Sequence, residues 1–374
     1  MLTVTRLAFD YFYSRMKKHP HRPCISGSLT RPAVRGGLLA LLAAGLFGVS
    51  TPLVQFFGAG LGAFTTAALL YVGAALVGTV LRQPIEREAR LQRSDWRRLL
   101  AMAGLGAVIG PVALAWGLQR TSGTSASLML TLEALFTAVL AWKLYHETMD
   151  RRVWLALILL LVGGVVLILD QGQQGNAQWL GLVAVLVATV AWGIDNTLSR
   201  GVADRDPGQV VWVKATLGAL ATAVVAAAIG EPRPSLTAVL GLLAVGATGY
   251  GLSLRFYLLA QRTFGAARTG SVFAFAPFIG AAVAFMLGDR SGSVLMGLGG
   301  LLMLTGVMLH LVETHGHQHA HEDLTHEHAH RHDDGHHGHL HDVMPAGSHS
   351  HLHRHDPVSH THAHVPDAHH VHRH

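Results

Sequence analysis

From residue 36 onward, the chain alternates between long apolar runs and short polar links. A helix that crosses the hydrocarbon core of a bilayer needs about 20 mainly apolar residues. Runs of roughly that length occur ten times. The pattern therefore predicts ten membrane-spanning helices, at 36–57, 61–81, 99–118, 124–142, 153–169, 179–198, 210–229, 236–259, 267–287 and 294–312.

The order of these runs repeats after the fifth. Three segments recur in the same order and at similar spacing: GLFGVSTPLVQ (45–55) as VAWGIDNTLSR (190–200), LQRTSG (118–123) as AQRTFG (260–265), and LLLVGGVVL (159–167) as LLMLTGVML (301–309). An odd number of crossings per repeat makes the second copy enter the membrane from the opposite side. We therefore predict an all-α membrane protein of two inverted five-helix repeats, 36–170 and 176–312, with a substrate site near the midplane between them.

Lys and Arg residues are concentrated in alternate links. If the N-terminus is inside, the links on that side hold twenty of them, whereas the opposite links hold only Arg120, Arg233 and Arg290. Basic residues collect on the cytoplasmic side of a membrane protein. We therefore expect both termini in the cytoplasm. Residues 1–35 lack the pattern of a signal peptide and are expected to form an uncleaved, basic cytoplasmic extension.

Composition agrees with a chain surrounded by lipid, because 50% of the residues are hydrophobic and only 13% are charged. The single cysteine, Cys24, excludes an internal disulfide and a cysteine-based metal site. The chain has no nucleotide-binding loop, catalytic triad or zinc-hydrolase motif. We therefore expect neither an enzyme nor a nucleic-acid partner, and the sequence leaves a homodimer open.

Ionisable groups inside a bilayer are costly and usually face the bundle interior or a wet cavity. Glu133, in the fourth predicted helix, is a candidate to bind a proton or a cationic substrate; the alternative is a protonated structural residue. Asp195 and Lys214 fall at matching depths in the sixth and seventh helices. With Asn196 and Arg200 beside them, they are candidates for a salt bridge that opens with an inner gate, or for a permanent clamp between two helices.

These segments resemble the EamA-type branch of the drug/metabolite transporter superfamily over about residues 36–312. The resemblance rests on the two repeated helix-opening segments, on TLEALFTAVLAWKLYHE (131–147), which is similar to the family's Leu-Glu-Pro helix, and on its counterpart FAPFIGAAVAFMLGD (275–289). Ala134 stands where the family has proline, whereas the second copy keeps Pro277 and lacks the glutamate. The resemblance implies ten helices in two repeats and transport of amino acids, metabolites or drugs.

The last segment, 313–374, has a different character. Residues 315–374 contain 23 histidines, mostly as His-x-His, together with eight acidic residues. This segment has too little apolar surface to fold alone, so we expect a disordered cytoplasmic tail. Neutral imidazole suits Zn, Ni, Co and Cu, so the tail is predicted to bind these ions at several weak sites; the alternatives are a metal-free acidic tail and a pH-responsive tail. The candidate ligands are His315, His317, His319, His321, His326, His328, His330, His332, His336, His337, His339 and His341.

Together these features predict a multi-pass transporter in a bacterial inner membrane, working by alternating access. Its cargo is a small solute: one hypothesis is a divalent transition metal or its chelate. A second is an amino acid, metabolite or drug that is exported while the tail only regulates transport or buffers metal. A third is a membrane-anchored metal buffer or sensor that transports nothing. Buried charges and an inverted repeat favour the first two, because an anchor needs only one helix.

Overall fold

The structure is a computed structural model, and it describes residues 31–84, 88–145, 149, 151–174, 176–264, 266–311, 316–320, 324–330, 349–355 and 359–363. The chain divides into two units, Met1–Arg31 and Pro32–His374. Only Arg31 of the first unit is described. The fold is therefore that of the second unit.

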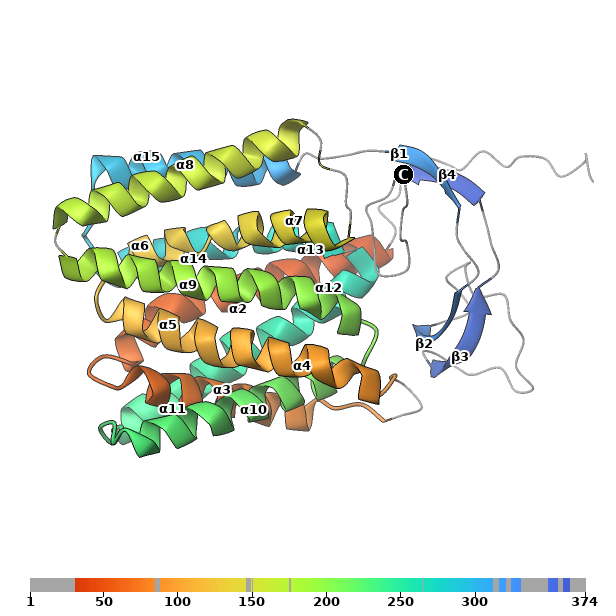
Figure 1. Ribbon diagram of the computed structural model, residues 1–374, viewed down its shortest axis with the longest axis horizontal. Helices are drawn as coiled ribbons and strands as arrows, with labels where there is room; N and C mark the ends of the chain where they lie inside the picture. Colours follow the sequence, from red (N-terminus) through yellow and green to blue (C-terminus); the bar gives the residue numbers. More distant parts are fainter. Residues whose placement is uncertain are drawn as a thin grey trace, which may run out of the picture. The chain divides into compact units, whose positions relative to one another are not determined.

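The described residues between 31 and 311 form a helical bundle (Figure 1). Helices suit these apolar runs because they satisfy every backbone polar group without water. The first half contains α2 (Arg31–Phe57), α3 (Ala63–Val80), η1 (Arg93–Asp95), α4 (Trp96–Met102), η2 (Ala103–Ile109), α5 (Gly110–Leu118), α6 (Gly123–Met129), α7 (Leu132–Tyr145) and α8 (Arg151–Gln174). The second half contains α9 (Asn176–Ser199), η3 (Arg200–Val202), α10 (Pro207–Ala228), α11 (Leu236–Val245), η4 (Gly246–Leu252), α12 (Ser253–Phe264), α13 (Ala266–Phe273), α14 (Ala276–Met286) and α15 (Val294–Leu311).

Among the described residues, nine helical segments are long and apolar enough to cross a membrane, from Arg35–Phe57 to Thr269–Met286. A further apolar helix, Val294–Leu309, is shorter. The all-helical membrane fold is therefore confirmed. The count of ten crossings stays a prediction.

The helices are irregular at equivalent places in the two halves. The π-helical stretches η2 and η4 begin at Ala103 and Gly246, 143 positions apart. The fourth and ninth predicted crossings are each interrupted, after Met129 and after Phe273. Such interruptions recur at the spacing of the sequence repeat, so they belong to the architecture of the fold.

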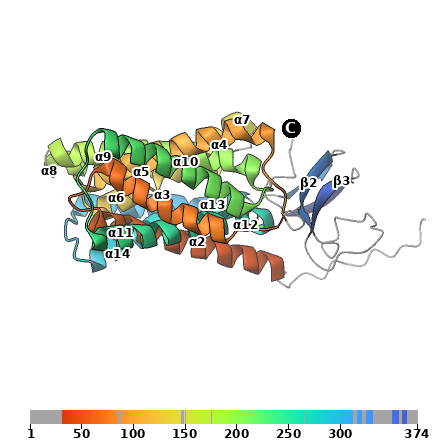
Figure 2. The ribbon, with the colours of Figure 1, turned by 90° about the horizontal axis from the view of Figure 1, so that it is seen from below.

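Two pairs of equivalent helices of the two halves pack together, α3 with α10 and α8 with α15, and α6 packs with α14, which belongs to the equivalent crossing (Figures 1 and 2). Glycines permit the close approach. A Cβ atom on Gly78 would lie 2.6 Å from the backbone nitrogen of Trp212, and one on Gly163 would lie 2.8 Å from the carbonyl oxygen of Gly299. Small residues commonly serve this purpose between membrane helices. Contacts between equivalent helices are what two inverted repeats produce.

Four segments of the tail belong to the described residues, and the disorder of the tail as a whole stays a prediction. The tail contains four short strands, β1 (Gly316–Ala320), β2 (Leu324–His330), β3 (His349–His355) and β4 (Ser359–Ala363). β1 pairs with β4 and β2 pairs with β3, both antiparallel. Extended His-x-His segments can satisfy their backbone groups by pairing with one another.

Candidate substrate site

Glu133 lies where the fourth predicted crossing is interrupted. α6 ends at Met129, and Glu133 is the second residue of α7. Its side chain is buried, and a carboxylate oxygen accepts a hydrogen bond from Nδ2 of Asn196 on α9. A negative charge is favourable in the first turn of a helix, where backbone N–H groups are unpaired. The interruption thus provides a polar position for an acid deep in the bundle.

Asp195 and Lys214 form a buried ion pair between α9 and α10, through Oδ2 of Asp195 and Nζ of Lys214. The two residues are only 3% and 4% exposed. Gly106 in η2 provides the space for this pair, because a Cβ atom there would lie 2.2 Å from Oδ2 of Asp195. Asp195 directly precedes Asn196, which binds Glu133. The structure therefore joins these four predicted site residues in one region.

Arg200 is less central than the other predicted site residues. It begins η3 at the end of α9, five residues beyond Asp195. A helix rises about 1.5 Å per residue, so Arg200 lies roughly 7 Å further along the axis. Arg200 therefore lies toward the end of the bundle and outside the buried cluster.

Aromatic side chains adjoin the charged cluster. The carbonyl of Gly106 accepts hydrogen bonds from Nε1 of Trp192 at 3.0 Å and from the hydroxyl of Tyr71. The Trp192 ring meets Phe47 at a centroid distance of 5.5 Å and Tyr250 at 6.3 Å. The π-helical stretch frees a backbone carbonyl for these contacts, as π-bulges at functional sites often do. The cluster is therefore both charged and aromatic.

Buried oxygen atoms near the interruption have unused hydrogen-bonding capacity. Ser127 Oγ, Thr131 Oγ1 and Asp195 Oδ1 have no hydrogen-bond partner among the described residues. Ser127 and Thr131 flank the end of α6, close in sequence to Glu133. Buried polar atoms normally find partners, and exceptions call for an explanation such as a ligand.

The counterpart of this contact under the repeat, between Ser50 of the first half and Gly249 of the second, repeats the packing without the charges. The sequence repeat aligns Ser50 with Asp195, and η4 places Gly249 where η2 places Gly106. A Cβ atom on Gly249 would lie 2.4 Å from the Cβ of Ser50, just as one on Gly106 would meet Asp195. The same helix contact is thus made with a serine. The fold alone does not require the ion pair.

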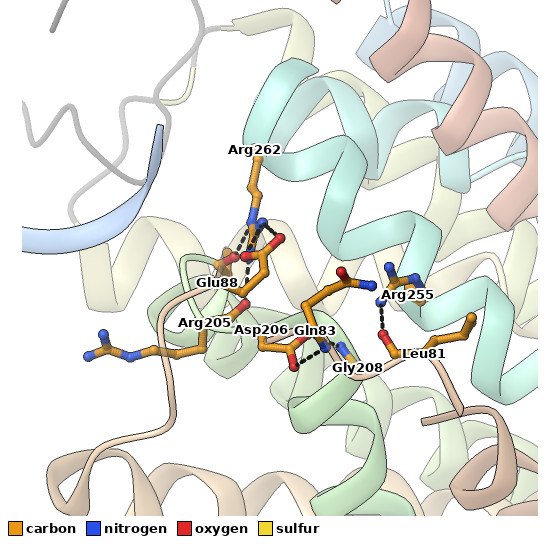
Figure 3. Close-up of polar contacts among 9 residues, drawn as sticks. Leu81, Gln83, Glu88, Arg205, Asp206, Gly208, Arg255 and Arg262 are labelled. Atoms are coloured by element: carbon orange, nitrogen blue, oxygen red, sulfur yellow. Dashed lines mark hydrogen bonds and ion pairs between the residues drawn. The ribbon is translucent and has the colours of Figure 1, made fainter. Parts of the chain in front are cut away.

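A second polar cluster joins links between helices at one end of the bundle (Figure 3). Arg262 on α12 binds both carboxylate oxygens of Glu88, at 3.0 and 2.9 Å, and donates to the carbonyl of Ala203 at 2.8 Å. Asp206 accepts hydrogen bonds from the backbone nitrogens of Gln83, at 3.1 Å, and Gly208, at 2.9 Å. We call this group the Glu88 network. It ties the link after α3 to the link between α9 and α10.

Sequence reasoning missed the Glu88 network. Glu88 and Arg262 are 174 positions apart, and of the two only Arg262 entered the sequence analysis, as one of the basic residues that indicate the cytoplasmic side. The available signal was that both fall in links on the same predicted side. Burial raises the pKa of Glu88 above its ordinary value, although the neighbouring Arg262 opposes this shift.

The opposite loops are joined by acids of the second half that cap helices of the first. Glu231 accepts hydrogen bonds from the backbone nitrogen of Thr65 at 2.6 Å, and Asp289 accepts one from that of Thr124 at 2.9 Å. Burial raises the pKa of Asp289, but hydrogen bonds from Ser291 and Thr124 outweigh burial and hold the pKa below its ordinary value. Carboxylates at helix N-termini are stabilising.

A polar pocket of about 460 Å³ lies beside these capped ends. It is lined by parts of α2, α3 and α5, including Gln55, Thr66 and Gln119. Gln55 donates to the carbonyls of Leu118 at 2.9 Å and Thr121 at 3.0 Å. This end of the bundle therefore offers a recess, whereas the Glu88 network bridges links at the other.

Of the predicted tail ligands, His317 and His319 lie in β1, and His326, His328 and His330 lie in β2. The others lie outside the described residues: His315, His321, His332, His336, His337, His339 and His341.

Comparison with known proteins identifies the class of protein that this fold represents. The EamA-like transporter family matches residues 34–169 and 179–312, once for each half. The chain therefore belongs to the EamA-like transporter family, and the resemblance found in the sequence is confirmed.

Individual relatives agree. An uncharacterized transporter of Methanothermobacter thermautotrophicus is 29% identical over 296 residues, which cover 73% of this chain and 85% of that protein. The uncharacterized transporter YyaM of Bacillus subtilis is 24% identical over 201 residues, 51% of this chain and 65% of that protein. One solved crystal structure matches with a TM-score of 0.54 and 19% identity, over 73% of this chain and 94% of that one, which shows the shared fold alone.

Proposed function

We propose that the protein is a secondary transporter that works by alternating access and carries a small organic solute with an amino group. The main support for this proposal is the buried Asp195–Lys214 pair next to Glu133 and Asn196. Burying an ion pair often stabilises a protein less than burying apolar side chains of similar volume. Because the equivalent contact between the halves is made by the uncharged Ser50 against Gly249, the charges are best explained by chemistry rather than by packing.

The balance of charges supports an amine. Glu133 and Asp195 supply two carboxyl groups, and Lys214 supplies one ammonium group. A solute ammonium would complement the second carboxyl group or compete with Lys214 for Asp195. The rings of Trp192, Phe47 and Tyr250 would contact the apolar part of the solute and favour its positive charge.

The different contacts at the two ends of the bundle are a second argument for alternating access. The Glu88 network joins links of both halves at one end, and the polar pocket beside Gln55 lies at the other. For a solute to cross, the network must open as the opposite end closes. Competition between the solute and Lys214 for Asp195 couples substrate binding to the contact between α9 and α10.

The alternatives from the sequence remain distinct hypotheses. A bare transition-metal ion prefers imidazole or thiolate ligands, whereas this cluster offers carboxylates, an amide and aromatic rings. That chemistry favours an organic cargo over Ni, Co, Zn or Cu. The histidine tail is a separate proposal, in which it binds transition metals and regulates transport or buffers metal. Bacterial inner-membrane location and cytoplasmic termini belong to the same model.

Transport by purified protein in liposomes tests the proposal. The probes are radiolabelled tyramine, as an aromatic amine, and labelled Ni²⁺ and Zn²⁺, each with an imposed pH gradient. We expect tyramine to move, and Glu133→Gln to slow it about tenfold or more, since a hydrogen bond to a charged group contributes about 1.5–3 kcal/mol. The control is Glu231→Gln, which keeps an acceptor for Thr65 far from the cluster.

The outcomes separate the hypotheses. Metal movement without amine movement overturns the amine proposal in favour of metal cargo. Metal retention with no movement of any probe supports the buffer or sensor. Equal slowing by Glu133→Gln and Glu231→Gln means that the buried acid has no specific role.

A further inference from the structure

The tail strands place histidines opposite histidines. Both ladders have a defined register, and in each of them every histidine of the first strand faces a histidine of the second. The five facing pairs are His317 with His362 and His319 with His360 in the β1–β4 ladder, and His326 with His353, His328 with His351 and His330 with His349 in the β2–β3 ladder.

The facing pairs within a ladder share one face. Alternate residues of a strand lie on the same side of the sheet. The rings of His349 and His351 agree with this rule, because they stack with a centroid distance of 5.3 Å and an interplanar angle of 12°. Positions on the other face include the facing pairs Glu327–Leu352 and Ala329–Ser350, which contain no histidine. Each ladder thus has a histidine face and a face without histidine.

We propose that two consecutive facing pairs in each ladder form a four-histidine site for Zn²⁺ or a similar transition-metal ion. Residues directly opposite one another in an antiparallel ladder have Cβ atoms about 4.5–5.5 Å apart. Consecutive pairs on one face are separated by about 7 Å along the strand. Four imidazoles at these positions can therefore converge on one tetrahedral ion, with metal–nitrogen distances of about 2.0–2.1 Å.

The strand register determines how many ions each ladder can hold. The β1–β4 ladder has two facing pairs and can hold one ion, and the β2–β3 ladder has three pairs and can hold one ion with a pair to spare. A flexible string of histidines would instead bind ions at interchangeable positions. The inference deepens the proposal that the tail binds metal and does not depend on what the bundle transports.

Metal binding to the full-length protein tests the ladder. Protein in detergent is stripped with a chelator and titrated with Zn²⁺, and with Co²⁺ for its absorption spectrum. The ladder variant is His317→Asn with His319→Asn. The control is His336→Asn with His337→Asn, which removes the same number of histidines outside the four strands.

We expect the ladder variant to lose one tightly bound ion per chain and part of the tetrahedral Co²⁺ signal, while the control keeps both. Equal losses in the two variants overturn the ladder and leave a flexible metal-binding string. Absence of tight binding in the unaltered protein overturns the ladder and metal binding by the tail together.

Cysteine crosslinking tests the register directly, in a Cys24→Ser background. Ala329→Cys with Ser350→Cys places thiols at facing positions, whereas Ala329→Cys with Leu352→Cys displaces one by two residues. Disulfides need Cα atoms about 4.4–6.8 Å apart. The facing pair should crosslink at least tenfold faster. Similar rates for both pairs contradict the register on which the sites depend.

Discussion

The sharpest prediction concerns the buried pair of Asp195 and Lys214. Asp195→Asn and Lys214→Met should each destabilise the protein and impair transport, and the double variant should recover part of the stability. Each single change leaves one charged group where both residues are almost fully buried, at 3% and 4% exposed. The double change removes both charges, so no orphaned charge remains.

The expected magnitude follows from this burial. Removing one partner of a buried ion pair costs about 3–5 kcal/mol. That is a factor of about 160 to 4,700 in the folding equilibrium, at about 1.36 kcal/mol per tenfold change. The double variant should regain most of this cost, which gives a coupling energy well above the error of about 0.3–0.5 kcal/mol for independent sites.

Reversible unfolding of all four proteins in detergent micelles measures the cycle. The Glu88–Arg262 pair supplies a matched control, because its side chains are more exposed, at 14% and 16%, and its coupling should be smaller. Strictly additive losses at Asp195 and Lys214 would refute the reasoning. If stability recovers in the double variant but transport does not, the pair has a role in transport beyond holding two helices together.

Three further predictions concern the packing of Gly106, the pKa of Glu88 and the topology of the chain. Gly106→Ala should impair transport and stability, because its Cβ atom would lie 2.2 Å from a carboxylate oxygen of Asp195. The control is Gly104→Ala in the same π-helical stretch, whose Cβ atom would meet nothing within 4 Å. Equal effects of the two changes would be inconsistent with this packing. Because burial raises the pKa of Glu88 in the folded state, its favourable contribution is present below the ordinary carboxyl pKa and is lost as pH rises through the raised pKa. Thermal unfolding between about pH 4 and pH 8 should therefore show wild type losing stability relative to Glu88→Gln as pH rises, and a constant difference would contradict the shift. Reporter fusions at Gly175 and after His374 should report opposite sides of the membrane, and a shared side would rule out an inverted repeat with five crossings in each half.

Much of the bundle could be predicted from the sequence because lipid imposes simple rules. Apolar runs of helical length give the crossings, and the recurrence of segments after five runs gives the two halves. The contact between Asp195 and Lys214 could also be predicted from the sequence. Asp195 and Lys214 lie at similar distances from the helix ends on the same predicted side of the membrane, and buried opposite charges favour one another.

Other features depend on how backbones meet, which a single sequence does not encode locally. The π-helical stretch at Gly106 and the interruption before Glu133 occur within runs that look uniformly apolar. The Glu88–Arg262 contact joins links from different halves. The strand register of the tail depends on pairing between segments that each repeat His-x-His, so composition alone does not predict which segments pair.

The asymmetry of the polar cluster within a repeated fold has a mechanistic consequence. If the cargo were held equally by both halves, the repeat would be expected to place charges at equivalent positions. Instead, Asp195 corresponds to Ser50, and Glu133 corresponds to Ala276 in the aligned segments. The first half therefore contributes Glu133 from the interrupted helix and the second half contributes Asp195 from the ion pair, while the equivalent positions, Ala276 and Ser50, carry small side chains. A solute bound there would be oriented, with its ammonium toward Glu133 and Asp195 and its apolar part toward the rings of Phe47 and Tyr250.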